Sequence, residues 1–117
     1  FTGCFQTKKD GVIDIIQLQD ILQESSLNNK EKLKMIVKQL MSNLNCKIGI
    51  VNLLENGRFN STIAYGVDFK YDCIYKVNSY PIYRNNLLLG VLILGSMKEL
   101  PVDPSIKNSL ELVSQLI

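Results

Sequence analysis

The chain has 117 residues, of which 46% are hydrophobic and 21% are charged, and its net charge is +2. These values are ordinary for one globular domain, and they exclude a disordered or fibrous chain. The small net charge does not argue for a nucleic-acid or anionic-membrane partner, and the absence of histidine excludes histidine-ligated haem and Ser-His or Cys-His nucleophile pairs.

The first helix is expected near the start of the chain. Residues 1–9 have no clear period and are predicted to be an N-terminal tail, and residues 10–117 are predicted to form a single domain. Asp10 is placed to cap the helix. Its main stripe has helical spacing and comprises Val12, Ile15, Ile16, Gln19 and Leu22. A further apolar set, Ile13, Leu18 and Ile21, widens this stripe, so the helix is expected to face two partners.

A second helix is predicted to begin at Asn28, because Asn28 and Glu31 have the spacing of a capping box. Asn43 and Asn45 are expected to mark its end. The apolar residues of this segment fall on one face at i, i+3 and i+4 spacing, and its lysines fall elsewhere. These apolar residues are Leu33, Ile36, Val37, Leu40, Met41 and Leu44.

Two hairpins are predicted next. Residues 47–55 are apolar on both faces, and Asn56-Gly57 is the strongest short signal for a tight hairpin turn. The return strand, 58–65, alternates, with Phe59, Ile63 and Tyr65 expected on one side and Asn60, Thr62 and Ala64 on the other. Gly66 ends it.

The second hairpin is the most apolar part of the chain. A short strand is expected at 73–77, followed by a strand that contains Pro81. The turn is predicted at Arg84-Asn85-Asn86, because Asn tolerates positive φ. Residues 87–94 are almost entirely apolar, which predicts a central strand covered on both faces.

A last helix is predicted from Pro104, with Asp103 as its N-cap. Its main stripe is Ile106, Leu110, Val113 and Ile117, and Leu112 and Leu116 widen it. The whole order predicts an α+β domain. We expect an antiparallel five- or six-stranded sheet with the N- and C-terminal helices packed on one face.

This order of elements, from about Asp10 to Ile117, resembles that of GAF domains, the regulatory domains of phytochromes and cyclic-nucleotide phosphodiesterases. Gly66, Pro81 and Gly90 in the two hairpins belong to the match. The motifs are apolar patterns and carry no chemistry. PAS-like, roadblock-like and longin-like domains stay open as alternative folds.

The resemblance implies a ligand held between the sheet and a helical cap that follows the second strand. Here only residues 67–78 occupy that interval, so a minimal member with a reduced cap and no enclosed cofactor cavity is expected. The cyclic-nucleotide signature of the family has no match. Cys73 lies in the interval used for bilin attachment, but Ile74 follows it and the chain has no histidine. We therefore predict no cofactor.

Six residues are candidates for a small-molecule site. Asn52 is an amide on an otherwise apolar strand face, and a buried amide needs a hydrogen-bond partner. Tyrosines offer an apolar ring with a polar tip, which suits a small pocket. The candidates are Asn52, Thr62, Tyr75, Tyr80, Tyr83 and Arg84. Structural roles for the same residues, such as shielding an open sheet face, stay open.

The partners are predicted from the terminal helices. Each helix can turn one face to the sheet, so the second apolar sets should form an exposed patch and an interface. We expect a homodimer through Ile13, Leu18, Ile21, Leu112 and Leu116. No nucleic acid and no membrane contact by this domain are expected, and the location is predicted to be cytoplasmic. The chain opens on Phe1 and closes on Ile117 in mid-pattern, so we expect a domain excised from a longer signalling protein.

Three functions compete. The first is a sensory domain that passes a ligand- or partner-induced change through its terminal helices to an effector domain of the same parent chain. The second is a ligand-free dimerisation or docking module. The third is a thiol-dependent reductase, but Cys4, Cys46 and Cys73 are scattered without a Cys-x-x-Cys pair. No pair of carboxylates is placed by sequence for acid–base work, so no enzyme is predicted.

Overall fold

The structure, a computed structural model, describes residues 13–66, 76–96 and 104–117. Asp10, Asp103 and the greater part of the strand expected at 73–77 lie outside these residues. The described elements are α1 (Ile15–Leu22), α2 (Asn29–Leu44), β1 (Cys46–Glu55), β2 (Arg58–Tyr65), β3 (Lys76–Arg84), β4 (Leu87–Ser96) and α3 (Pro104–Ser114).

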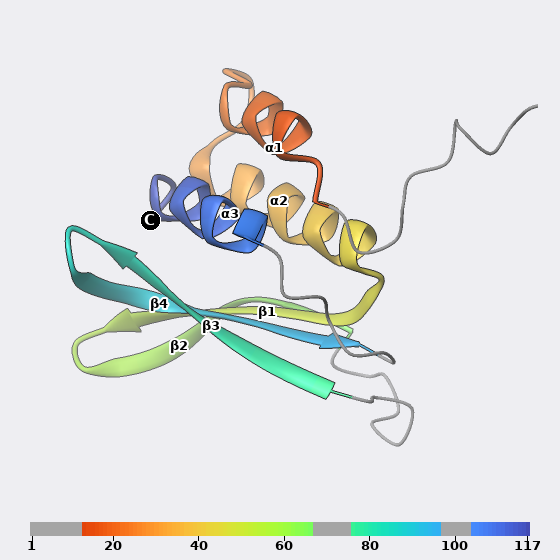
Figure 1. The fold of residues 1–117 in the computed structure, drawn as a ribbon. Coiled ribbons are helices and arrows are strands. Elements are labelled where there is room, and N and C mark those ends of the chain that lie inside the picture. Colours follow the sequence, from red (N-terminus) through yellow and green to blue (C-terminus); the bar gives the residue numbers. More distant parts are fainter. Residues whose placement is uncertain (1–12, 67–75, 97–103) are drawn as a thin grey trace, which may run out of the picture.

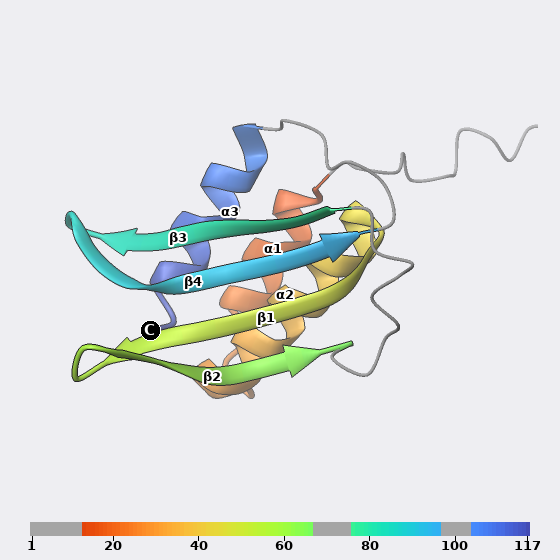
Figure 2. The same cartoon turned by 90° about the horizontal axis from the view of Figure 1, so that it is seen from below.

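The strands form one antiparallel sheet in the order β2-β1-β4-β3 (Figure 2). Two hairpins therefore lie side by side, joined where β1 pairs with β4. The described residues contain four strands rather than the five or six that the sequence predicts. Lys76 and Val77, expected at the end of a separate strand, instead begin β3.

Both predicted turns are confirmed. Asn56 and Gly57 have φ of 53° and 78°, and Asn85 and Asn86 have φ of 53° and 64°. Positive φ at both central residues matches the twist of the flanking strands, so each hairpin closes with a two-residue loop. Figure 1 shows both turns at the same end of the sheet.

The limits of α2 follow from its side chains. Asn28 and Glu31 form the predicted capping box, in which each side chain accepts a hydrogen bond from the other residue's backbone N–H. Asn45 ends the helix in the left-handed conformation. Asn43 does not mark the end: it lies inside the helix, is buried, and accepts a hydrogen bond from the backbone N–H of Asp14 at 2.9 Å.

The helices all lie over one face of the sheet (Figure 1), but they form two layers. The inner layer is α2, which contacts β1, and α3, which contacts β3. The main contacts of α1 are with α2 and α3, so α1 lies on the other helices instead of on the sheet. It begins later than predicted, because Asp14 accepts a hydrogen bond from the backbone N–H of Gln17 and caps it.

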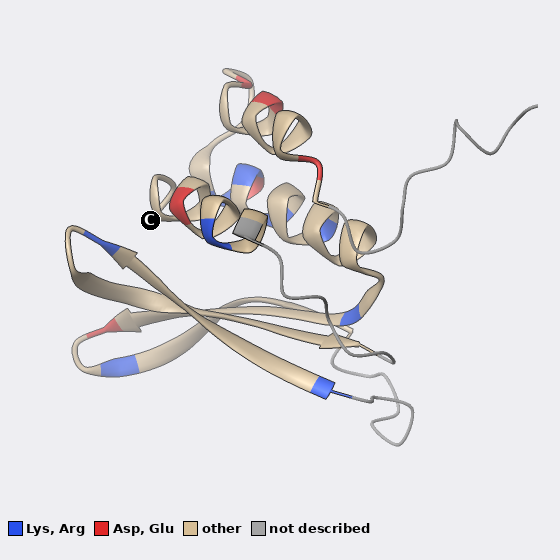
Figure 3. Cartoon of the chain, in the orientation of Figure 1, with Lys and Arg blue, Asp and Glu red and all other residues tan. Residues whose placement is uncertain are grey.

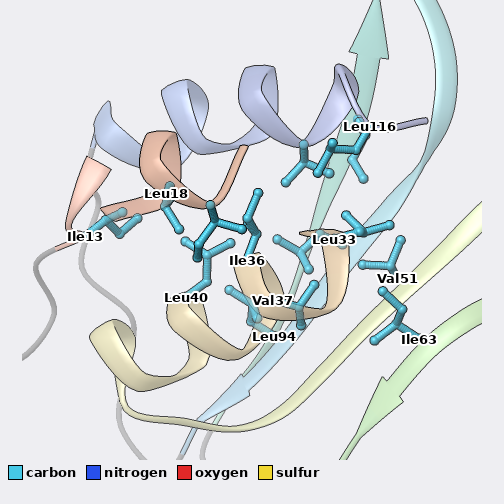
Figure 4. Close-up of a cluster of buried hydrophobic side chains, with 14 of the residues drawn as sticks. Ile13, Leu18, Leu33, Ile36, Val37, Leu40, Val51, Ile63, Leu94 and Leu116 are labelled. Carbon is cyan, nitrogen blue, oxygen red and sulfur yellow. The ribbon is translucent and has the colours of Figure 1, made fainter. Parts of the chain in front are cut away.

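This second layer overturns the expected exposed patch. Ile13, Leu18 and Ile21 are buried in one cluster with residues of α2. Figure 4 shows Ile13 and Leu18 beside Ile36 and Leu40 of that helix. At the other terminus Leu116 is buried and Leu112 is half-buried against the same cluster. The side chains predicted to face a second subunit therefore fill the core of the domain, because α1 packs against two helices at once.

Candidate functional site

The two faces of the sheet have different surroundings. A side chain at Gly49 would meet Met41 and Val37 of α2, so this position faces the helices. Because side chains alternate along a strand, the opposite face of β1 carries Ile48, Ile50, Asn52 and Leu54. We call this side of the sheet, on which none of the described helices lies, the outer face. Figure 2 looks onto it, with the helices behind.

The outer face is mainly apolar. The strand register places Val91 and Ile93 of β4 beside β1 on this face, and Phe59 of β2 beside Leu54. On β3 the same register brings Val77 and Tyr83 to it. Phe59, Val77 and Tyr83 are 52%, 53% and 54% exposed. The site therefore offers a broad apolar surface with one aromatic ring on each outer strand.

The position of Phe59 differs from the expected alternation. The sequence pattern predicts Phe59 on the same side as Ile63, but a β-bulge intervenes: Ile63 pairs with Val51 and Ser61 with Asn52. Thr62 is left as the extra residue, which shifts the phase of the strand. Ile63 consequently enters the core while Phe59 lies on the outer face.

Charge is absent from the middle of this surface. Within the described strands, charged side chains occur only at the first or last two positions, and they are Lys47, Glu55, Arg58, Lys76 and Arg84. Figure 3 shows the central part of the ribbon of the sheet without charged residues. An anionic group bound at the centre would have no cationic partner there, so the surface suits an uncharged occupant.

Asn52 is the main polar group on the outer face. It is half-buried and lies between Ile50 and Leu54 along β1, with Ser61 and Val91 as its cross-strand partners. Within the part of the chain that the structure describes, no hydrogen bond is recorded for its side chain. The amide is therefore available to donate to and accept from an occupant of this face.

The predicted ligand-site residues that the structure describes do not gather in one place. Asn52 and Tyr83 lie on the outer face. Thr62 lies at the bulge of the edge strand β2, where its hydroxyl donates to the carbonyl oxygen of Asn60 at 3.4 Å. Tyr75 is outside the described residues.

Tyr80 and Arg84 lie on the helix-facing side, so they are not part of the outer face. Tyr80 packs against the core, and burial raises the pKa of its hydroxyl, with a further contribution from the neighbouring Cys46. Arg84 reaches the C-terminal end of α3, where Nη1 donates to the carbonyl oxygen of Ser114 at 3.1 Å and to a backbone oxygen of Ile117 at 3.0 Å.

The thiol of Cys46 is buried in the core, and burial raises its pKa to about 11. A thiol of such high pKa is almost entirely protonated near neutral pH and is a poor nucleophile. Cys4 and Cys73 lie outside the described residues. Among the described residues there is also no group of three or more His, Cys, Asp or Glu side chains that could hold a metal ion. None of the described helices is long and apolar enough to cross a membrane.

Sequence reasoning selected Asn52 and Tyr83 as candidates, and both lie on the outer face, but it did not select the residues around them. The available signal was the alternation of side chains along each strand, which puts every second residue on the same face. The residues it concerns are Phe59 on β2, Val77 on β3, and Val91 and Ile93 on β4. The alternation could not show which face the helices cover, and the bulge at Thr62 concealed the position of Phe59.

Comparisons with known proteins support the fold. The GAF domain from an Acinetobacter phosphoenolpyruvate-protein phosphotransferase superposes with a TM-score of 0.65 at 12% identity, over 87% of this chain and 90% of that one. The GAF domain of a protein assigned as a sensor histidine kinase, from Pseudomonas syringae pv. tomato, gives a TM-score of 0.58 at 14% identity, over 87% and 81% of the two chains. No protein-family model and no curated protein sequence matches.

Proposed function

Because this chain has the GAF fold, we propose that it is a non-catalytic regulatory domain that binds an uncharged small molecule on the outer face of its sheet. The observation that carries the proposal is the outer face itself: apolar at its centre, free of helices among the described residues, and provided with one available amide at Asn52. A ligand with an apolar body and an amide-, hydroxyl- or carbonyl-type group would match this surface.

The proposal also covers how the domain passes on its bound state and where in the cell it works. The two solved GAF domains come from a phosphotransferase and a protein assigned as a sensor kinase, which supports a regulatory role in general. We propose that the bound state is passed through the terminal helices to an effector domain of the same parent chain. A cytoplasmic location is proposed with it, and Cys46 as a free thiol is consistent with a reducing compartment.

A second candidate function is docking of another protein on the same surface. It is favoured by the exposure of Phe59, Val77 and Tyr83, because aromatic residues are enriched at protein interfaces. We keep it as the alternative. The buried thiol of Cys46 gives no support to a reductase.

The test is a thermal-shift screen of uncharged and charged small molecules. A ligand that binds only the folded state raises the unfolding midpoint by mass action. For any compound that does so, Asn52→Ala should weaken binding by about three- to tenfold, the usual effect of losing one hydrogen bond. The matched control is Asn60→Ala. Asn60 is an exposed asparagine on β2 that faces the helix side and donates to Glu55, so its replacement should leave binding unchanged.

Two outcomes would contradict the ligand proposal. One is equal binding by the Asn52 and Asn60 variants. The other is a preference for anions, since the centre of the outer face has no cation to receive them. A screen without any ligand, together with a specific protein partner whose binding is abolished by Phe59→Ser, would favour the docking alternative.

A further inference from the structure

Arg84 makes a contact that the proposed function does not use. It is the last residue of β3, and its guanidinium group donates to Ser114 and Ile117, 30 and 33 residues further along the chain. Figure 1 shows the C-terminal end of the chain over the same end of the sheet as the β3–β4 turn. One side chain therefore joins the tip of a hairpin to the end of a helix.

The receiving end of α3 has carbonyl oxygens to satisfy. The last carbonyls of a helix lack intrahelical partners and carry the negative end of its dipole, so a cation there is favourable. Short-range hydrogen bonds tighten this turn: the backbone N–H groups of Gln115, Leu116 and Ile117 donate to Leu112, Val113 and Ser114. These bonds and the hydrogen bonds from Arg84 involve the same backbone segment, residues 112–117. If this last turn opened, its backbone oxygens would move away from the guanidinium group of Arg84.

The other end of the contact lies next to the outer face. Tyr83 directly precedes Arg84 and points to the outer face, whereas Arg84 points to the helix side. The two residues occupy successive positions of one strand, next to the two-residue turn at Asn85 and Asn86. A displacement of Tyr83 therefore also moves Arg84.

We propose that Arg84 couples the β3–β4 turn to the last turn of α3, so that a change at this end of the outer face alters the order of residues 115–117. The idea that a ligand on the outer face is the natural trigger of this change rests on the proposed function. The coupling through Arg84 does not depend on it. With the contact made, the end of α3 is held to the hairpin, and without it the end of α3 frays.

The first experiment is backbone amide exchange, measured by NMR on the full 117-residue chain without ligand. Arg84→Ala should speed exchange of the Gln115, Leu116 and Ile117 amides by about two- to fivefold, the size expected for losing a cation at a helix C-terminus. Arg84→Glu should speed it further, because a carboxylate would face carbonyl oxygens. Exchange in β1 and α2 should not change.

The chain offers a matched control in its other hairpin. Arg58 also flanks a two-residue turn containing asparagine, and no hydrogen bond from it to a helix is recorded among the described residues. Arg58→Ala should leave residues 115–117 unaffected. An unchanged rate in Arg84→Ala, or a rate raised equally throughout the chain, would overturn the proposal.

The second experiment tests transmission through this side chain. Asn85→Ala strains the β3–β4 turn, because alanine disfavours the positive φ of 53° at this position. It should speed exchange at residues 115–117 in the wild-type background and add nothing in the Arg84→Ala background, whereas Asn56→Ala in the other hairpin should have no effect there. Additive effects of Asn85→Ala and Arg84→Ala would refute the coupling. Since no ligand is used, this result is independent of the screen that tests the outer-face site.

Discussion

Leu18 and Ile16 stand two residues apart in α1 and have opposite environments. Leu18 is 0% exposed and Ile16 is 72% exposed, although the sequence pattern assigned Ile16 to the main buried stripe. The side of α1 that is buried is the side that packs against α2 and α3, and the sheet does not determine it. The burial of each residue therefore depends on where the helix lies in the fold.

Replacing each of these residues with alanine tests this assignment. Leu18→Ala should lower the free energy of unfolding by about 2–5 kcal/mol, because it leaves a cavity in the core. Ile16→Ala should change it by less than about 0.5 kcal/mol, as is usual for exposed positions. Urea denaturation of both variants measures the difference. Equal losses would mean that α1 does not lie as described.

Cys46 provides a chemical prediction. Its pKa rises from 9.0 to about 11 in the fold, so the thiolate fraction at neutral pH falls about a hundredfold. In a Cys4→Ser, Cys73→Ser background Cys46 is the sole thiol, and its alkylation by iodoacetamide at pH 8 should be about a hundredfold slower in the native protein than in urea. Comparable rates under the two conditions would show that the thiol is accessible.

The same shift makes stability depend on pH. Below about pH 9 the thiol is protonated in both states, and its protonation has no effect on stability. Between about pH 9 and 11 the unfolded chain loses the proton while the native state keeps it, so rising pH favours unfolding. The fall in stability over this range should be smaller in Cys46→Ala than in the wild type, since other titrating groups are common to both.

At the scale of elements, the local signals were reliable. Asn56-Gly57 and Asn85-Asn86 form their turns, Asn28 and Glu31 form the capping box, and Pro104 begins α3, because each signal involves residues close in sequence. The start of α1 and the phase of β2 were wrong. The backbone N–H of Asp14 donates a hydrogen bond to the side chain of Asn43 in α2, and the bulge at Thr62 depends on the pairing of β2 with β1. Neither interaction is local.

The two glycines that flank β2 provide an element-scale prediction. Gly57 and Gly66 have φ of 78° and 77°, but only at Gly66 would an added Cβ collide with the backbone carbonyl of Lys47. Gly57→Ala should cost about 1–2 kcal/mol, from the left-handed backbone alone. Gly66→Ala should cost more. Thermal or urea unfolding compares them, and the reverse order would argue against the described pairing at the end of β2.

At the scale of the whole molecule, the sequence predicted an α+β domain with an antiparallel sheet and terminal helices, but not the separation of the helices into two layers. Only the packing of α1 on α2 and α3 buries Ile13, Leu18 and Ile21. The positions of the candidate site residues could not be predicted fully for the same reason, because they depend on how the helices pack on the sheet. Tyr80 and Arg84 could be placed near the second hairpin, but their sheet face and the carbonyl partners of Arg84 depend on α3, which follows them in sequence.

The homodimer stays a prediction, but its test needs a residue other than the five that the sequence placed in the interface. If the outer helical layer forms the interface, the apolar group still available on α1 is Ile16. The chain should then sediment as a dimer at high micromolar concentration. Ile16→Glu should yield a folded monomer, with Gln19→Glu on the same exposed side of the helix as the control for charge. A wild-type monomer at that concentration would exclude this interface.

The strand order also has a kinetic consequence. Each hairpin can form from residues close in sequence, within microseconds, but the sheet is complete only when β1 meets β4, for example at Val51 and Leu92. Closing this long segment is the slower, entropically costly event. Until it happens, each hairpin exposes the unpaired edge of an apolar strand, the part of a chain most prone to pair with another copy. The yield of refolded protein should therefore fall as chain concentration rises, and mutations in β4 should affect that yield more strongly than equally destabilising mutations in α1.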